Sequence, residues 1–220
     1  MIIVLDPGIG NLHSVLGGLR RVGTEGRVVA SRGEWEAAMG EERAVQGVIL
    51  PGVGAFGDAI SQMRLRGLCD VVRDAVARSI PLLGICLGMQ LLFTSSEEHG
   101  VFRGLDLVPG HVVRFPGGAK VPHMGWNSLK VRAPHHPLLR DVREGDYVYF
   151  VHSYYAVAER GEDVIASTPY AGVEVPAVVA RGGVMGAQFH PEKSGSVGER
   201  ILANFVRIAA YPALLEGVRP

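Results

Sequence analysis

The chain has 220 residues, 22 basic and 22 acidic side chains, and a formal net charge of zero. This balance gives no basic excess that would favour nucleic acid as a partner and no acidic excess typical of disorder. No apolar run approaches the ~18 residues of a membrane span, and the N-terminus lacks the features of a signal peptide. The two cysteines, Cys69 and Cys86, are too few for a disulfide scaffold, so we expect a reducing cytoplasm.

Short apolar runs alternate with helix-like segments in the first half of the chain. We expect strands at 2–6, 27–31, 45–50 and 81–85, and helices at 12–22, 34–39, 56–77 (Gly67 is a candidate break) and from 87 to 93. Asn11 is placed to cap the first helix. This order favours parallel strand–helix–strand units, and the continuous apolar strands favour a sheet covered on both faces.

The second half is richer in strands. We expect them at 108–115, 128–131, 147–151, 164–168, 175–180 and 184–189, followed by a helix at 197–210. No repeat and no long linker divides the chain. The sequence therefore predicts a single α/β domain over residues 1–220, with a central, mostly parallel sheet, helices on both faces, and an added antiparallel or mixed sheet in the second half.

A pentapeptide of the form Gly-x-Cys-x-Gly, centred on Cys86, joins an apolar strand to an apolar helical run. This is the layout of a nucleophile elbow, in which flanking glycines avoid clashes in a strained turn. The N–H groups at a helix N-terminus would stabilise a thiolate there. The alternative is a small buried cysteine in a tight turn.

His190 and Glu192 flank a proline after the last apolar strand. A nucleophilic cysteine needs a base, and that base needs a partner to hold its tautomer. An extended segment around the proline would place both side chains on the same side, within contact. The alternative is a solvated surface turn.

A Gly-rich loop, Gly52-Val53-Gly54, follows the third strand. In a parallel sheet it would lie at the same edge as Cys86, where α/β proteins place their sites. Its N–H groups, with that of Leu87, could form an oxyanion hole. The alternatives are an ordinary turn and a phosphate loop, and the latter lacks the usual Gly-Lys-Ser/Thr sequence.

Segments 51–54, 84–90 and 188–192 together resemble the signatures of the class I (triad-type) glutamine amidotransferases, in the family's order and over nearly the whole chain. The resemblance implies that Cys86 is the nucleophile, His190 the general base and acid, and Glu192 the orienting carboxylate. The reaction would hydrolyse L-glutamine to glutamate and ammonia through a thioester. In the family, Gln90 and a His-Ser-Tyr segment, here His152, Ser153 and Tyr154, help to hold the amino-acid end of the substrate.

Segments 6–14 and 120–127 are similar to the glutaminase subunits of imidazole glycerol phosphate synthases, although Pro7 stands where tyrosine is more frequent. This implies a heterodimer with a (β/α)8-barrel cyclase and a role in histidine biosynthesis, with a carboxamide product that leads to purines. The candidates for the docking or signalling surface are Asn11, Lys120, His123 and Trp126. Their alternatives are a helix cap for Asn11, a solvated charge for Lys120 and a core position for Trp126.

A docked synthase subunit is also expected because residues 1–220 contain no second domain that could use ammonia. No spacing of Cys and His fits a zinc site, so we predict no metal and no organic cofactor. Three alternatives stay open. They are a glutaminase for another acceptor, of the anthranilate or aminodeoxychorismate synthase type, a cysteine peptidase of similar fold, and a non-catalytic binding module.

Overall fold

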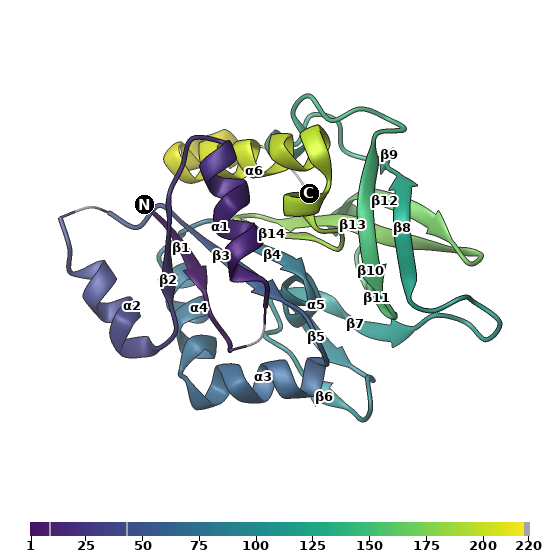
Figure 1. Cartoon of the computed structure of the whole chain (residues 1–220), viewed down its shortest axis with the longest axis horizontal. Coiled ribbons are helices and arrows are strands. Elements are labelled where there is room, and N and C mark those ends of the chain that lie inside the picture. Colours follow the sequence, from purple (N-terminus) through teal and green to yellow (C-terminus); the bar gives the residue numbers. More distant parts are fainter. Residues whose placement is uncertain (9, 43, 218–220) are drawn as a thin grey trace.

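An eight-stranded sheet runs through the molecule, with helices against both of its faces (Figure 1). The computed structural model describes residues 1–8, 10–42 and 44–217. The strand order is β2-β1-β3-β4-β14-β13-β12-β9, parallel from β2 to β14 and antiparallel beyond. The strands are β1 (Ile2–Leu5), β2 (Gly26–Val29), β3 (Gly47–Gly52), β4 (Leu82–Cys86), β9 (Lys130–Val131), β12 (Val164–Tyr170), β13 (Val173–Arg181) and β14 (Val184–Ala187).

Two hydrophobic cores lie on opposite faces of this sheet. Alternate residues of β1 separate into them: Ile3 and Leu5 enter one core, Ile2 and Val4 the other. Because successive side chains of a strand point to opposite faces, the helices divide in the same way. The first core contains residues of α2 (Arg32–Met39), α3 (Phe56–Leu65), α4 (Leu68–Ala77) and α5 (Leu87–Leu91), and the second contains residues of α1 (Leu12–Arg21) and α6 (Gly195–Ala210).

Two smaller sheets lie beside the large sheet: β8 and β10 are drawn next to its antiparallel strands, and β5 and β6 lie next to α5 and α3 (Figure 1). One has the order β11-β7-β5-β6 and the other pairs β10 with β8. Their strands are β5 (Phe93–Ser96), β6 (Phe102–Arg103), β7 (Val108–Arg114), β8 (His123–Ser128), β10 (Tyr147–His152) and β11 (Tyr154–Ala158). Short 3-10 turns occupy Pro137–Leu139, Gly161–Asp163, Pro191–Lys193 and Pro212–Leu215.

The predicted α/β fold, with a mostly parallel central sheet and helices on both faces, is confirmed, and so is the break at Gly67, which adopts φ +69° between α3 and α4. Two predicted segments were wrong in detail. The helix after Cys86 ends at Leu91, and Phe93 begins β5 instead of continuing it. The expected strand at 128–131 is divided between the end of β8 and the short β9. β6 and β11 were not predicted from the sequence.

None of the helices in the described part of the chain combines the length and the apolarity needed to cross a membrane.

Candidate active site

Cys86 ends β4 in a conformation that is rare for a residue with a side chain. Its φ is +54° and its ψ is −111°, a strained combination that occurs preferentially at functional sites. The flanking glycines are required by packing. A Cβ on Gly84 would lie 2.6 Å from the carbonyl oxygen of Gly88, and a Cβ on Gly88 would lie 1.8 Å from that of Leu50. The predicted elbow geometry is therefore present.

The helix that follows the elbow, α5, has only five residues. A helix macrodipole is the sum of aligned peptide dipoles, so a helix this short contributes little. The stabilisation of a thiolate that the sequence led us to expect from the helix is therefore small.

His190 and Glu192 form a buried pair. His190 Nδ1 lies 2.7 Å from Glu192 Oε1, and the two residues are 3% and 9% exposed. The carboxylate accepts, so Nδ1 carries the proton. The predicted contact is present, but the reason given for it was wrong. Pro191–Lys193 forms a 3-10 turn rather than an extended segment, and this turn brings the carboxylate back to the ring.

The electrostatics of His190 favour its charged form. Burial lowers the pKa of His190, but the Cys86 side chain and the Glu192 carboxylate outweigh it and raise the pKa to about 9. Among the described residues, His190 Nε2 and Glu192 Oε2 have no hydrogen-bond partner. A protonated imidazole with a free Nε2–H is the group that a departing amine needs as its acid.

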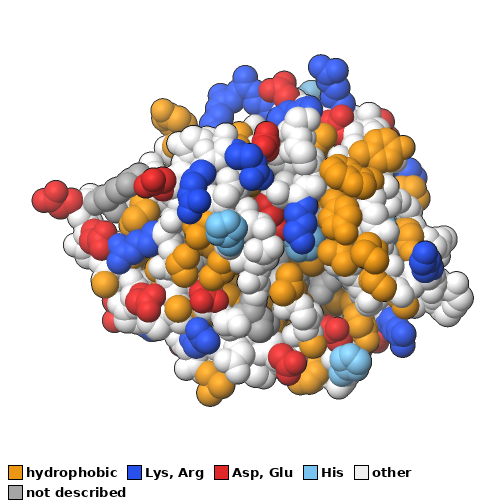
Figure 2. Space-filling view, in the orientation of Figure 1, with side chains coloured by type: hydrophobic (Ala, Val, Ile, Leu, Met, Phe, Trp, Pro, Cys, Tyr) orange, Lys and Arg blue, Asp and Glu red, His pale blue; other side chains and the backbone are white. Residues whose placement is uncertain are grey.

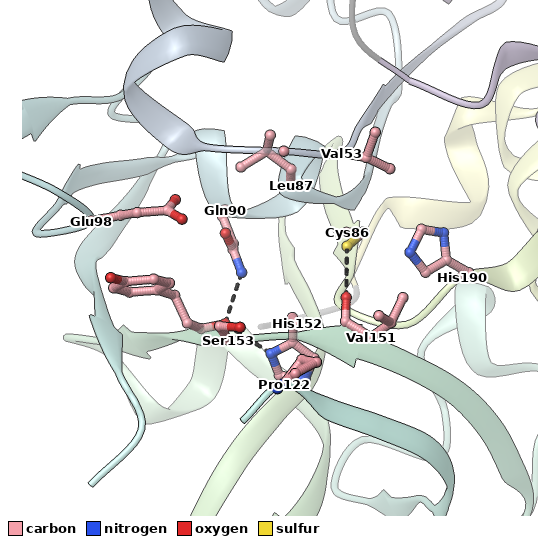
Figure 3. A pocket seen from close by; sticks show the side chains of 12 residues that line it. Val53, Cys86, Leu87, Gln90, Glu98, Pro122, Val151, His152, Ser153 and His190 are labelled. Atoms are coloured by element: carbon pink, nitrogen blue, oxygen red, sulfur yellow. Dashed lines mark hydrogen bonds between the residues drawn. The ribbon is translucent and has the colours of Figure 1, made fainter. Parts of the chain in front are cut away.

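The register of the sheet brings the three predicted segments together. Gly52 of β3 pairs with Cys86 of β4, and Ala187 of β14 pairs with Ile85 on the other side. The carboxyl ends of these parallel strands open into a cavity of about 350 Å³, where the sulfur of Cys86 lies beside His190 and Val151 (Figure 3). Seven other predicted residues line the same cavity: Val53, Gly54, Leu87, Gln90, His152, Ser153 and Tyr154.

The Gly-rich loop has two different glycines. Gly54 adopts φ +95°, a conformation that glycine accepts without strain, and lines the cavity. Gly52 lies against the elbow, where an added Cβ would be 3.1 Å from Gly88 N and from Leu87 Cβ. Val53, between them, is 40% exposed. The loop can therefore present backbone N–H groups beside Cys86, and its backbone has more conformational freedom at Gly54 than at Gly52.

Gln90 holds the cavity wall by its amide. Its Nε2 donates to the carbonyl oxygen of Tyr154 at 2.9 Å and to Gln188 Oε1 at 3.0 Å. Gln188 Nε2 in turn lies 3.9 Å from Cys86 Sγ. Because both amide hydrogens of Gln90 are used, only its carbonyl oxygen is left to accept from a bound molecule.

One carboxylate of the cavity, Glu98, was not predicted from the sequence. Its Oε2 accepts from the N–H of Phe56 at 2.8 Å, which aims the side chain into the cavity near Gln90 and Ser153 (Figure 3). Glu98 lies in a polar turn after β5, where an acidic residue is usually solvated. Only the contact with α3 distinguishes it, and no local pattern indicates that contact.

The family model described as "Glutamine amidotransferase class-I" matches residues 3–209. The chain belongs to this family. The imidazole glycerol phosphate synthase subunit HisH of Geobacillus kaustophilus is 52% identical over 95% of this chain and 97% of its own length, and that of Moorella thermoacetica is 48% identical over 96% of each.

Solved structures agree on the fold. A crystal structure of a glutamine amidotransferase has a TM-score of 0.70 at 22% identity, covering 95% of this chain and 98% of its own. The PurLQS structure from Thermotoga maritima has a TM-score of 0.70 at 19% identity, with 94% and 97% covered. These likenesses support the α/β fold of the class I glutamine amidotransferases.

Three of the docking candidates of this amidotransferase have side chains at the surface. Asn11 and Lys120 are exposed, and Trp126 is 53% exposed. Asn11 also caps α1, since its Oδ1 accepts from Ser14 N at 3.2 Å. His123 is only 1% exposed, so the prediction that it belongs to a contact surface was wrong. It lies on the inward side of β8, stacked on the rings of Phe150 and Tyr170.

An apolar patch lies on the outer face of the small β8–β10 sheet of the amidotransferase. Met124 is 62% exposed, Trp126 53% and Tyr147 58%, and the ring of Tyr149 contacts Trp126 edge-on. We call these four residues the outer patch. Figure 2 shows apolar side chains gathered over this part of the molecule. Contiguous exposed apolar side chains of this kind mark interaction surfaces.

Within the described residues of the amidotransferase, no three His, Cys, Asp or Glu side chains gather in a group that could hold a metal ion.

Proposed function

We propose that this chain is the glutaminase subunit of an imidazole glycerol phosphate synthase, formed by a single domain over residues 1–220 and working in the cytoplasm. The observation that carries the proposal is the cavity at the carboxyl ends of β3, β4 and β14, which holds a strained cysteine beside a histidine–glutamate pair. The relatives that are about half identical over nearly the full length are named as subunits of that synthase.

The first half of the reaction forms a thioester. The thiol proton of Cys86 passes to His190 Nε2, the sulfur attacks the side-chain amide carbon of L-glutamine, and the carbonyl oxygen becomes an oxyanion. N–H groups of the Val53–Gly54 loop and of Leu87 stabilise that charge. As the C–N bond breaks, the Nε2–H of His190 donates its proton, and ammonia leaves.

The second half restores the enzyme. His190 accepts a proton from water, the resulting hydroxide attacks the thioester carbon, and glutamate leaves as the proton returns to the sulfur. Throughout, the Glu192 carboxylate accepts from Nδ1–H of His190 and keeps Nε2 toward the reacting atoms. Its 2.7 Å contact in a buried setting supports this role.

The amino-acid end of glutamine carries both a cation and an anion, and the cavity offers groups of suitable chemistry. The Glu98 carboxylate and the Gln90 carbonyl oxygen accept from an ammonium group, and the Ser153 hydroxyl can donate to a carboxylate. Glu98 and Ser153 both line the cavity, on different elements. This arrangement favours a free amino acid as substrate over an internal position of a peptide.

Ammonia formed here needs an acceptor before it is protonated in water. We propose that a cyclase subunit with a (β/α)8 barrel docks on the outer patch and receives it, as a heterodimer. The patch lies on β8 and β10, and the last residues of β10 form the cavity wall. A partner bound there would therefore lie close to the leaving ammonia.

The test is to mix the chain with an imidazole glycerol phosphate cyclase subunit and to measure glutamate release with and without its phosphoribulosyl-formimino nucleotide. We expect release that depends on the cyclase and rises with the nucleotide. Cys86→Ala should abolish release while leaving the complex able to use added ammonium salts. Glutamate release by Cys86→Ala would contradict the assigned nucleophile, and release that ignores this cyclase would favour another acceptor.

A further inference from the structure

Two buried histidines lie behind the outer patch, and the proposed reaction uses neither of them. His123 of β8 and His152 of β10 face each other in the strand register, and their exposed fractions are 1% and 7%. His123 Nδ1 lies 3.0 Å from His152 Nε2. A close contact between two imidazoles requires one ring to donate and the other to accept, so the direction of this hydrogen bond can be worked out.

The direction is set at the cavity end. His152 Nδ1 lies 2.8 Å from the carbonyl oxygen of Tyr154, and a carbonyl can only accept, so Nδ1 of His152 carries a proton. Burial lowers the pKa of His152 to about 3. The ring is therefore neutral at neutral pH, and its Nε2 is a bare acceptor. His123 must donate to it through Nδ1–H.

The second ring nitrogen of His123 contacts the side-chain amide of Asn127. Burial lowers the pKa of His123 despite an opposing effect of Asn127, which favours the neutral ring, and a neutral ring with its proton on Nδ1 accepts at Nε2. Asn127 Oδ1 lies 2.9 Å from that nitrogen, which would set two acceptors against each other. A half-turn of the amide, which exchanges two groups of nearly equal shape, places the Nδ2–H donor there instead.

The result is a one-way chain of hydrogen bonds. With the Asn127 amide turned in this way, Asn127 donates to His123, His123 to His152, and His152 to the Tyr154 carbonyl. The same carbonyl accepts from Gln90, and Gln90 leads through Gln188 to the sulfur of Cys86. We call the part from Asn127 to Tyr154 the histidine chain.

We propose that His123 and Asn127 are positioning residues for glutamine hydrolysis, because the histidine chain holds the wall of the substrate cavity, residues 152–154, against β8. The inference rests on the proposed function. Its structural basis is that His152, Ser153 and Tyr154 line the cavity, while His123 and Asn127 alternate along β8 with Met124 and Trp126 of the outer patch. One strand thus carries both the docking side chains and the support of the cavity wall.

The first test reads the hydrogen bonds directly. Long-range ¹⁵N–¹H NMR of the chain with ¹⁵N-labelled histidine distinguishes the two neutral tautomers. We expect His123 and His152 both to carry the proton on Nδ1 at neutral pH. An Nε2–H tautomer or a charged ring at either residue would overturn the chain. This result does not depend on activity, so it stands apart from any failure of the proposed function.

The second test is kinetic, in the complex with the cyclase. His123→Phe keeps a flat ring between Phe150 and Tyr170 but leaves His152 Nε2 without its donor. We expect KM for glutamine to rise about tenfold with kcat changed less than about twofold, the signature of weakened substrate binding. Asn127→Ala should move KM in the same direction. Unchanged KM in a folded variant would overturn the proposal.

A matched control is Tyr170→Phe. It removes only the hydroxyl that donates to the Lys120 carbonyl and keeps the ring stacked on His123, so KM should stay at the wild-type value. An equal rise in KM would assign the effect to packing and overturn the positioning role. A wild-type complex that releases no glutamate would contradict the proposed function. The tautomers of His123 and His152 would still show whether the hydrogen bonds of the histidine chain are formed.

Discussion

Gly88 and Leu50 are held so closely that only hydrogen fits between them: a Cβ on Gly88 would lie 1.8 Å from the Leu50 carbonyl oxygen. Leu50 belongs to β3 and pairs with Gly84 of β4, so its backbone cannot move without disturbing the sheet. We expect Gly88→Ala to lower the free energy of unfolding by about 1–3 kcal/mol or more, as overpacking does. Chemical denaturation of the purified variant measures this.

The control for that substitution is Gly33→Ala in α2, where an added Cβ meets no atom within 4 Å. Alanine is the better helix former by about 0.5–1 kcal/mol, so this variant should be as stable as the wild type or more stable. Equal stability of the two variants would show that the elbow tolerates a side chain at Gly88.

Replacing Glu192 by Gln should separate positioning from charge at the triad. The amide cannot hold His190 as the carboxylate does, and we expect kcat to fall by about 10²–10⁴-fold, as for the third member of other triads. Steady-state glutamate release in the cyclase complex measures it, with circular dichroism as a check on folding. A fall of less than about threefold would contradict the role of Glu192.

The same variant has a signature in stability against pH. The folded-state pKa of His190, about 9, lies above its ordinary value of 6.5. The stabilisation from its partners is therefore complete below pH 6.5 and is lost as the pH rises through 9. Wild-type stability should fall over that window, and Glu192→Gln should show a smaller fall. Urea unfolding at pH 6.5 and 9 measures the free energy of unfolding of both proteins. An equal fall in the wild type and in Glu192→Gln would contradict the prediction.

His136 should make the protein sensitive to acid. The side chain is 4% exposed, its Nδ1 accepts from the N–H of Leu138, and burial lowers its pKa to about 4. The unfolded chain takes up a proton below pH 6.5 and the folded chain does not, so stability falls with falling pH. The loss from this group between pH 7 and 5 is about 2 kcal/mol. His136→Asn, which can still cap the turn, should remove that part of the pH dependence, and an unchanged slope would contradict it.

Trp126 should anchor the partner. It is exposed in the outer patch beside Tyr149, and buried aromatic anchors carry a large share of interface energy. We expect Trp126→Ala to weaken binding of the cyclase subunit by about 2 kcal/mol or more, roughly 30-fold in Kd. Titration calorimetry measures it. Leu65→Ala, on an 80% exposed residue of α3, should leave Kd unchanged.

The sequence was most informative where one local rule acts alone. The apolar runs of β3 and β4 and the paired glycines around Cys86 could be interpreted directly, because a parallel sheet brings its carboxyl ends to one edge. The contact of His190 with Glu192 was predicted too, but through an extended segment that is in fact a turn. Spacing of two residues allows both geometries, so the residues alone could not choose between them.

The parts that could not be predicted depend on contacts between distant segments. Glu98 enters the cavity only because Phe56 N–H holds it, and His123 is buried only because β8 turns that side toward Phe150 and Tyr170. β8 contains Gly125 and Asn127, which weaken its strand signal. A surface role for His123 and the omission of Glu98 are therefore failures of the same kind, since tertiary packing decided both.

β4, which ends at Cys86, and β14, which ends three residues before His190, are neighbours in the sheet although almost half of the chain separates them. The chain between these two strands forms the wall of the cavity at residues 151–154 and also the outer patch. The thiol and its acid–base partner therefore lie at the edge of the central sheet, whereas this wall of the cavity and the outer patch are formed by the chain between β4 and β14. Substitutions in the outer patch can therefore change the partner that receives ammonia without changing the residues that cleave glutamine.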